Sequence, residues 1–273
     1  MKDCIIINDY SAFGSNSLAV GLPVLAALGV KAHAFPSAVL SAQTEFSGYA
    51  KTELNLAPFF AMAKEQFSPA PALLSGYLSS VRQAKELKAY LEQARPTPYL
   101  LDPVLGDGGA LYHGFTPKNV QAVRSLLPYA TLVTPNLTEA ALLTGADYKS
   151  LISSCEKEGA TAALALAERL VECGAKAVAI TGVCHKAEIQ TLLLADGKSH
   201  VISKPLKRES RSGMGDLFAA LAFGYLLCGK NLSSACTRAA KLAALALDAT
   251  EQKDGRLGTD FEKILPLLCA EQP

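Results

Sequence analysis

Short apolar runs alternate with segments of helical periodicity along most of the chain. The apolar runs predict strands at residues 4–7, 73–74, 99–101, 132–133 and 177–180. Between them, apolar side chains at helical spacing predict helices at residues 16–28, 80–94, 117–127, 137–143 and 160–173. Strands that are apolar on both faces are typical of a parallel sheet covered by helices on both sides. We therefore predict a doubly wound α/β fold with a mainly parallel central sheet.

The last third of the chain adds a predicted β-hairpin and two long helices. Residues 188–194 and 200–202 flank Asp196-Gly197, a dipeptide typical of tight hairpin turns. The helices are predicted at residues 216–228 and 232–248. No internal repeat and no linker rich in proline or glycine divides the sequence. We expect a single domain covering residues 1–273.

Composition and charge narrow the class of protein. Half of the residues are hydrophobic and the net charge is +1, with no basic stripe of the kind that binds nucleic acid. The longest nearly unbroken apolar run, residues 217–228, is shorter than the ~20 residues that span a bilayer. The seven scattered cysteines and four histidines form no zinc motif and no His-based nucleophilic motif. We expect a cytoplasmic protein that binds neither nucleic acid nor membranes.

The strongest candidate site is the segment Gly213-Met214-Gly215-Asp216, before a predicted helix. Glycines let the backbone approach a ligand, and free N–H groups at a helix start attract anions. Asp216 could align an alcohol and accept its proton, while these amides neutralise charge on a transferring phosphoryl group. Alternatively, Asp216 is only the N-cap of the helix. Because a helix N-terminus favours a charged carboxylate, we expect Asp216 to be a weak base.

Two further segments could hold Mg²⁺ and phosphates. Asp102 and Asp107 lie in a glycine-rich loop after the third predicted strand, where they could bind hydrated Mg²⁺ or only form a turn. Asn136 and Glu139 are three residues apart at a predicted helix start. They could face one Mg-phosphate group together, or form a capping box.

Polar and aromatic residues after other apolar runs could line a substrate pocket. Asp9 and Ser11 follow the first predicted strand, and Thr44 and Tyr77 follow the next two apolar runs. Taken alone, each of them fits a capping or packing role better than a ligand contact. The chain has neither a Walker A lysine motif nor Gly-x-Gly-x-x-Gly, so a P-loop enzyme and a Rossmann dehydrogenase are not favoured.

Taken in order, these segments resemble the pyridoxal and pyridoxamine kinases of the ribokinase-like superfamily, most closely the bacterial pyridoxamine kinase type. The specific stretches are residues 9–14, 36–44, 74–78, 102–107, 134–145, 178–182 and 213–220. The resemblance implies a ribokinase-like fold and ATP-dependent phosphorylation of the 5′-hydroxymethyl group of a vitamin B6 vitamer, a salvage reaction that gives the 5′-phosphate. The substrate would be pyridoxal, pyridoxine or pyridoxamine. The resemblance also implies Mg²⁺, a monovalent cation (K⁺ or Na⁺) and a homodimer.

The resemblance further implies roles for single residues. Asp216 matches the catalytic aspartate, and Gly213, Met214 and Gly215 match the anion hole. The positions that match ATP-binding residues are Asp102, Asp107, Asn136, Glu139, Thr181 and Gly182, with Asp102 and Glu139 also as candidate metal ligands. Thr44 and Tyr77 match residues that bind or stack on the pyridine ring. Asp9 stands where many relatives have a serine that contacts the ring nitrogen, so either Asp9, facing a protonated nitrogen, or Ser11 would make this contact.

Two other functions stay open. Hydroxymethylpyrimidine kinases share the superfamily fold, but they usually carry a Ser-Gly-Gly-Ala-Gly-type stretch after the first strand and often a cysteine in place of Asp216. This chain has neither feature. A non-catalytic sensor of B6 or nucleotide on the same scaffold would not need Asp216. We therefore favour the B6 kinase.

Overall fold

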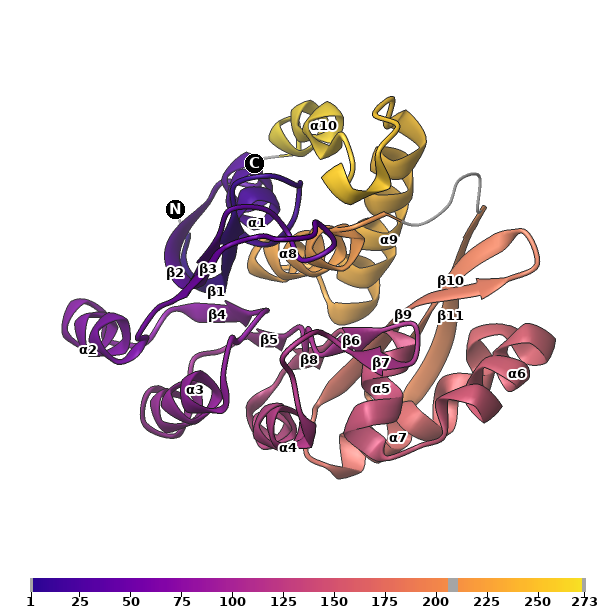
Figure 1. Cartoon of the computed structure of the whole chain (residues 1–273), viewed down its shortest axis with the longest axis horizontal. Coiled ribbons are helices and arrows are strands. Elements are labelled where there is room, and N and C mark those ends of the chain that lie inside the picture. Colours follow the sequence, from indigo (N-terminus) through magenta and orange to yellow (C-terminus); the bar gives the residue numbers. More distant parts are fainter. Residues whose placement is uncertain (1, 206–210, 272–273) are drawn as a thin grey trace.

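Figure 1 shows a computed structural model of the protein, in which residues 2–205 and 211–271 are described. Its strands are β1 (Lys2–Ser11), β2 (Val30–Leu40), β3 (Lys51–Glu53), β4 (Ala72–Ser75), β5 (Tyr99–Leu101), β6 (Gly106–Asp107), β7 (Ala110–Leu111), β8 (Leu132–Val133), β9 (Ala177–His185), β10 (Glu188–Ala195) and β11 (Lys198–Pro205). Its α-helices are α1 (Ser17–Ala27), α2 (Ala57–Gln66), α3 (Val81–Ala94), α4 (Pro117–Arg124), α5 (Leu137–Thr144), α6 (Tyr148–Glu158), α7 (Leu164–Glu172), α8 (Met214–Leu227), α9 (Leu232–Ala249) and α10 (Leu265–Cys269).

Nine strands form one sheet in the order β11-β10-β9-β8-β5-β4-β1-β2-β3. The strands from β9 to β2 pair in parallel, whereas β3 at one edge and β10 and β11 at the other are antiparallel. β6 and β7 form a separate small hairpin. The predicted doubly wound, mainly parallel α/β fold is confirmed.

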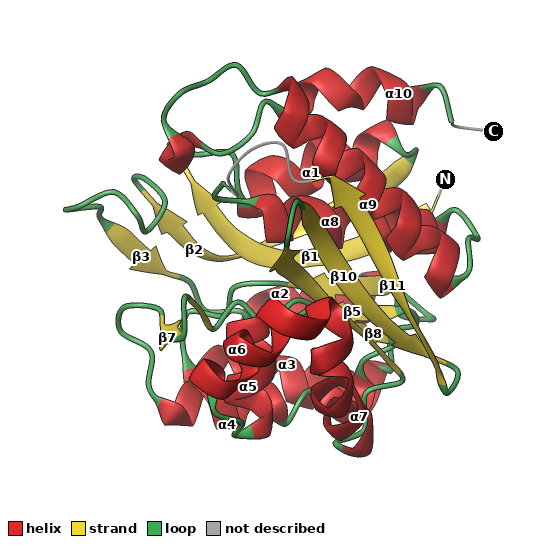
Figure 2. Ribbon diagram, turned by 90° about the vertical axis from the view of Figure 1, so that its right-hand side faces the viewer, coloured by secondary structure: helices red, strands yellow, loops and turns green. Residues whose placement is uncertain are grey.

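Each central strand is buried on both faces, which explains its apolar sequence. In β1, Ile5 and Ile7 join the core under α2 to α7, and Cys4 and Ile6 join the core under α1, α8, α9 and α10. Figures 1 and 2 show these two groups of helices on opposite faces of the sheet. None of the helices in the described ranges is both long and apolar enough to cross a membrane.

Some elements depart from the sequence prediction. β2 was not predicted, because Lys31, His33 and Pro36 interrupt its apolar residues. Helix α6 was not predicted either, since only two of its residues, Leu151 and Cys155, are buried. The helix predicted from residue 160 begins as a 3₁₀ segment, and its α-helical part, α7, starts at residue 164.

Candidate active site

A cavity of about 560 Å³ lies where the loops after β5 and β8 and the middle of β9 meet the start of α8. Parallel strands end at the same edge of a sheet, so residues from distant parts of the chain meet there. The predicted catalytic and ATP-binding residues all line this cavity: Asp102, Asp107, Asn136, Glu139, Thr181, Gly182, Gly213, Met214, Gly215 and Asp216. We call the six from Asp102 to Gly182 the nucleotide side.

The start of α8 depends on Gly213. This residue is the N-cap, with a left-handed φ of 76°, and a Cβ atom on it would lie 2.0 Å from the carbonyl oxygen of Ser15. Glycine is therefore required for both the conformation and the close approach. The first intrahelical bond joins the Leu217 N–H to the Gly213 oxygen, so the N–H groups of residues 214–216 have no partner within the helix.

Asp216 is the third residue of α8 and not its N-cap, so the capping alternative is wrong. Burial raises the pKa of Asp216 to about 6, and the charge of Asp9 adds to this shift. Hydrogen bonds from the Ser17 backbone and from Asn8 act in the opposite direction. The expected weak base is thus corrected, because the loss of water around the carboxylate outweighs the helix dipole.

Asn8, on β1, connects Asp216 to the segment that follows β4. Its Nδ2 donates to Asp216 Oδ1 at 2.8 Å, and its Oδ1 accepts from the backbone N–H of Tyr77 at 2.8 Å. A Cβ atom on Gly76 would lie 2.4 Å from Asn8 Nδ2, so the fit around this side chain is tight. The sequence analysis did not select Asn8, although its place after the apolar run of β1 was a usable signal.

Two further acids, Asp102 and Glu139, line the cavity together with Asp216. Burial raises the pKa of Asp102 well above its usual range, and the charges of Glu139 and Asp216 add to the effect. Burial also raises the pKa of Glu139 to about 7. The cavity therefore holds three carboxyl groups that repel one another, an arrangement that a cation would stabilise.

The predicted capping box at the start of α5 is present as well. Glu139 Oε2 accepts from the Asn136 N–H, and Asn136 Oδ1 accepts from the Glu139 N–H, both at 2.9 Å. Glu139 Oε1 accepts from the Leu105 N–H at 2.9 Å. Both oxygens of Glu139 thus hold backbone groups, whereas no hydrogen bond is seen between the Asp102 carboxylate and the rest of the described chain.

The carboxylates of Asp102 and Glu139 could bind Mg²⁺ only if other groups supplied the remaining ligands. No three His, Cys, Asp or Glu side chains within residues 2–205 and 211–271 form a metal-binding group. Mg²⁺ commonly takes one or two carboxylates and completes its shell with water and substrate phosphates. The donor set is compatible with this mode of binding.

The predicted pyridine-binding residues, Asp9, Ser11, Thr44 and Tyr77, do not line the cavity, and we call them the substrate side. Asp9 Oδ2 accepts from Ser11 Oγ at 2.9 Å, and both residues are buried. Thr44 is exposed on the loop between β2 and β3. Tyr77 packs against Phe115, with ring centroids 5.5 Å apart and an angle of 10° between the planes.

Comparison with known proteins identifies the family. Residues 24–259 match the family described as phosphomethylpyrimidine kinase. The chain belongs to this family. It is 28% identical to a Bordetella avium pyridoxine/pyridoxal/pyridoxamine kinase, over 97% of this chain and 89% of that protein.

Two solved structures agree with the fold. Pyridoxal kinase from Lactobacillus plantarum is 31% identical, covers 99% of this chain and 97% of its own, and superposes with a TM-score of 0.89. A Bacteroides thetaiotaomicron family member, solved in a form with pyridoxal, is 28% identical with the same TM-score, over 98% of this chain and 95% of its own. The ribokinase-like resemblance to pyridoxal kinases is confirmed.

The cavity of this family member also contains residues that the sequence analysis missed. Tyr112 lines it, and burial together with the nearby acids raises the pKa of its hydroxyl. The Thr134 Oγ1 atom is buried at the cavity without a hydrogen-bond partner among the described residues. Arg211 and Arg256 add positive charge to the lining. Thr134 opens the stretch 134–145 and Arg211 lies just before Gly213, so their places beside these segments were usable signals. Tyr112 and Arg256 have no such signal and reach the cavity only through the tertiary fold.

Proposed function

We propose that this protein transfers the γ-phosphoryl group of ATP to the 5′-hydroxymethyl oxygen of pyridoxal, pyridoxine or pyridoxamine. The observation that carries the proposal is the cavity in which Asp216, at the start of α8, faces the buried acids Asp102 and Glu139. Similarity to B6 kinases along nearly the whole chain supports the same chemistry.

Asp216 aligns the alcohol and takes its proton. The alcohol oxygen forms a bond to the γ-phosphorus while the bond between that phosphorus and the bridging oxygen of ADP breaks. A pKa of about 6 leaves the Asp216 carboxylate mostly ionised at neutral pH but more basic than an exposed aspartate. The free N–H groups of Met214 and Gly215 neutralise charge that develops on the γ-phosphoryl oxygens.

The nucleotide side binds the phosphates of ATP and the metal. Mg²⁺, when bound, neutralises phosphate charge and aligns the γ-phosphoryl group. Asp102, whose carboxylate is not engaged by described residues, is the candidate direct ligand. Glu139 already accepts two backbone N–H groups, so we assign it a contact through water. Asp107, Asn136, Thr181 and Gly182 complete the nucleotide side.

The substrate side is proposed to contact the pyridine ring, through Thr44, through Tyr77, and through either Asp9 or Ser11 at the ring nitrogen. From the resemblance we also infer a monovalent cation (K⁺ or Na⁺), a homodimer and a single kinase domain over residues 1–273. Free cysteines at all seven positions agree with a location in the cytoplasm.

A second candidate is phosphorylation of hydroxymethylpyrimidine, because the matched family is described as phosphomethylpyrimidine kinase. Both substrates present a hydroxymethyl group on a planar heterocycle, so the same three acids could serve either reaction. The two functions therefore differ only in how the ring is bound.

An ATP-consumption assay with pyridoxal, pyridoxine, pyridoxamine and hydroxymethylpyrimidine tests the proposal. We expect activity on at least one B6 vitamer and a loss of about 10³-fold in kcat for Asp216→Asn. Asp196→Asn, in the exposed turn between β10 and β11, is the matched control and should retain activity. No turnover of any vitamer, or a fully active Asp216→Asn, would refute the proposal.

A further inference from the structure

Lys51 and Tyr77 form a pair of donors beside the substrate side. Lys51 Nζ donates to Tyr77 Oη at 2.8 Å and lies 5.2 Å from the centroid of the tyrosine ring. The ammonium group is therefore at the hydroxyl edge of the ring and not above its face. Within the described residues, no carboxylate lies within ion-pair distance of Lys51, and the Tyr77 hydroxyl donates to no other group. The pair thus presents a free positive charge and a hydroxyl proton.

This pair adjoins the cavity and the catalytic carboxylate. Tyr77 shares a small hydrophobic cluster with Phe115 and Val104, and Val104 lines the cavity. The backbone N–H of Tyr77 donates to Asn8, the same side chain that donates to Asp216. A substrate ring bound against Tyr77 would present one edge to the ammonium and hydroxyl groups.

Lys51 and Asp9, which carry groups of opposite charge, both lie near Tyr77. The positive charge of Lys51 favours the ionised form of Asp9, against the effect of burial, which raises the pKa of Asp9. Lys51 and Asp9 are thus close enough to interact, one cationic and one acidic. A heterocycle that carries both a protonated nitrogen and an anionic oxygen would complement them.

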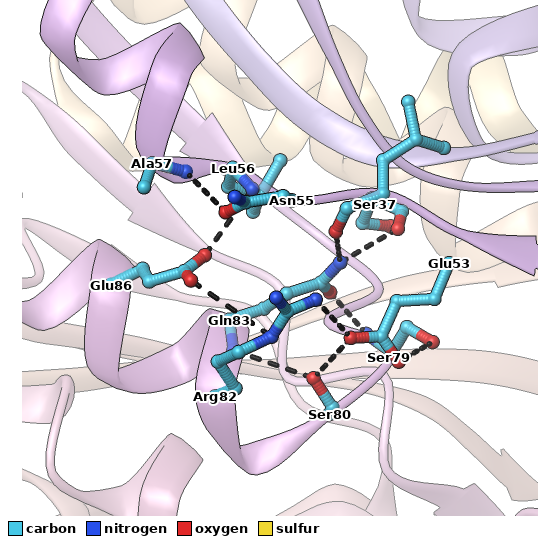
Figure 3. Close-up of polar contacts among 11 residues, drawn as sticks. Ser37, Glu53, Asn55, Leu56, Ala57, Ser79, Ser80, Arg82, Gln83 and Glu86 are labelled. Carbon is cyan, nitrogen blue, oxygen red and sulfur yellow. Dashed lines mark hydrogen bonds and ion pairs between the residues drawn. The ribbon is translucent and has the colours of Figure 1, made fainter.

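A polar network holds the strand of Lys51 against the loop of Tyr77 (Figure 3). Glu53 lies two residues after Lys51 on β3 and so points to the same side of the strand. It accepts from Ser80 Oγ at 2.8 Å and from Ser79 Oγ at 3.3 Å, in the segment that follows Tyr77.

Gln83 extends this network on α3. Its Nε2 donates to the carbonyl oxygens of Ser37 at 2.7 Å and Leu54 at 2.8 Å, and its Oε1 accepts from the Ser79 N–H at 2.7 Å. Gln83 is fully buried, and its bonds to Ser37 and Ser79 are shielded from water, whereas its bond to Leu54 is partly buried. The position of Lys51 relative to Tyr77 is therefore set by the packed scaffold and not by the long lysine side chain alone.

We propose that Lys51 and the Tyr77 hydroxyl bind the ionised 3-oxygen of the B6 ring and so select B6 vitamers over hydroxymethylpyrimidine. This inference rests on the proposed function. In a 3-hydroxypyridine the proton moves readily from oxygen to nitrogen, which leaves a ring oxide that a cation and a hydroxyl stabilise. Hydroxymethylpyrimidine carries an amino group and no ring oxygen, and its N–H bonds would face two donors.

Pyridoxine and 3-deoxypyridoxine, which lacks only the ring hydroxyl, test this inference. We expect the wild-type protein to prefer pyridoxine, in calorimetric affinity and in KM. Lys51→Met should weaken pyridoxine binding about tenfold, as for one lost charge-assisted hydrogen bond, and leave 3-deoxypyridoxine unchanged. The kcat should stay within about twofold, because Lys51 does not contact the reacting atoms. Lys51→Arg should retain most of the preference for pyridoxine over 3-deoxypyridoxine.

Lys88→Met is the matched control, because Lys88 is likewise a lysine beside a tyrosine ring, that of Tyr129, but lies outside the cavity lining. Lys88→Met should leave the affinities for pyridoxine and 3-deoxypyridoxine unchanged. Equal weakening of the two ligands by Lys51→Met would mean a merely structural role and overturn the inference, as would equal wild-type affinity for them. Because calorimetry needs no turnover, absence of phosphorylation would refute the proposed function separately.

Discussion

The nucleotide side and the substrate side differ in how their side chains are used. On the nucleotide side, Asp102 and Glu139 face a shared cavity and repel each other. On the substrate side, Asp9 and Ser11 bond to each other and do not line the cavity. Phosphate chemistry needs carboxylates and free N–H groups at strand and helix ends, which short motifs encode. Recognition of a heterocycle depends on contacts between distant segments, which motifs do not describe.

The largest contrast in rate and stability is expected between two substitutions on the nucleotide side, Asp102→Asn and Glu139→Gln. Asp102→Asn should lower kcat about a hundredfold and raise the Mg²⁺ concentration needed for half-maximal rate, since the proposed metal ligand is lost. It should not reduce the free energy of unfolding, because it removes a repelled buried charge. The rate is measured as a function of Mg²⁺ concentration, and the free energy of unfolding is measured by urea denaturation.

Glu139→Gln is the matched comparison, because its amide group would place two donors against the N–H group of Leu105 or Asn136. We expect it to lower the free energy of unfolding by about 1–3 kcal/mol. If both variants destabilised the protein equally, the distinction between a ligand and a structural carboxylate would be lost.

Stability should depend on pH through the same acids. The folded pKa values of Asp216, about 6, and Glu139, about 7, exceed their ordinary values of 3.8 and 4.5. Between about pH 4 and pH 7 the unfolded chain has released these protons and the folded protein has not, so stability falls as the pH rises. The decrease should be on the order of 3 kcal/mol for each group.

Urea unfolding without Mg²⁺ at a series of pH values measures this decrease. The control is Glu139→Gln, which should lose its share of the slope because an amide does not titrate. A wild-type curve no steeper than that of the variant over this range would contradict the assigned pKa values.

A smaller effect on kcat is expected for Asn8, which contacts both Asp216 and the backbone of Tyr77 on the substrate side. Asn8→Ala removes the hydrogen bond that favours ionised Asp216, so the acid limb of the kcat profile should move to higher pH. We expect about a tenfold loss in kcat at neutral pH, with a partial recovery at alkaline pH. An unshifted profile with the same loss would indicate that Asn8 only positions the backbone of Tyr77.

The smallest effect is expected from the polar network of Glu53 and Gln83, which holds the strand of Lys51 in place. Glu53→Gln should raise the KM for pyridoxine about twofold and leave the KM for ATP unchanged, because it loosens only the strand of Lys51. Glu65→Gln, on the surface of α2, is the matched control. A change in the KM for ATP alone would show that the two sides are not independent.

The sequence was most informative where a signal is local. The apolar runs of β1, β5 and β9 predicted buried parallel strands, and Gly213 and Gly215 at the start of α8 predicted an anion-binding helix start. Sequence reasoning failed where partners are distant. Asn8 has no motif of its own, and it is notable only because β1, β4 and α8 meet around it.

The sequence by itself determined the fold class and the family, and it predicted the candidate residues for phosphate chemistry, since these depend on periodicity and on motifs of a few residues. Only the tertiary structure decided the direction in which the pKa of Asp216 shifts and the pairing of Lys51 with Tyr77. Local reasoning from the helix dipole predicted a weak base at Asp216, but burial raised its pKa. Burial and charge at a site are set by groups that the chain brings together from far apart, so no short segment encodes them.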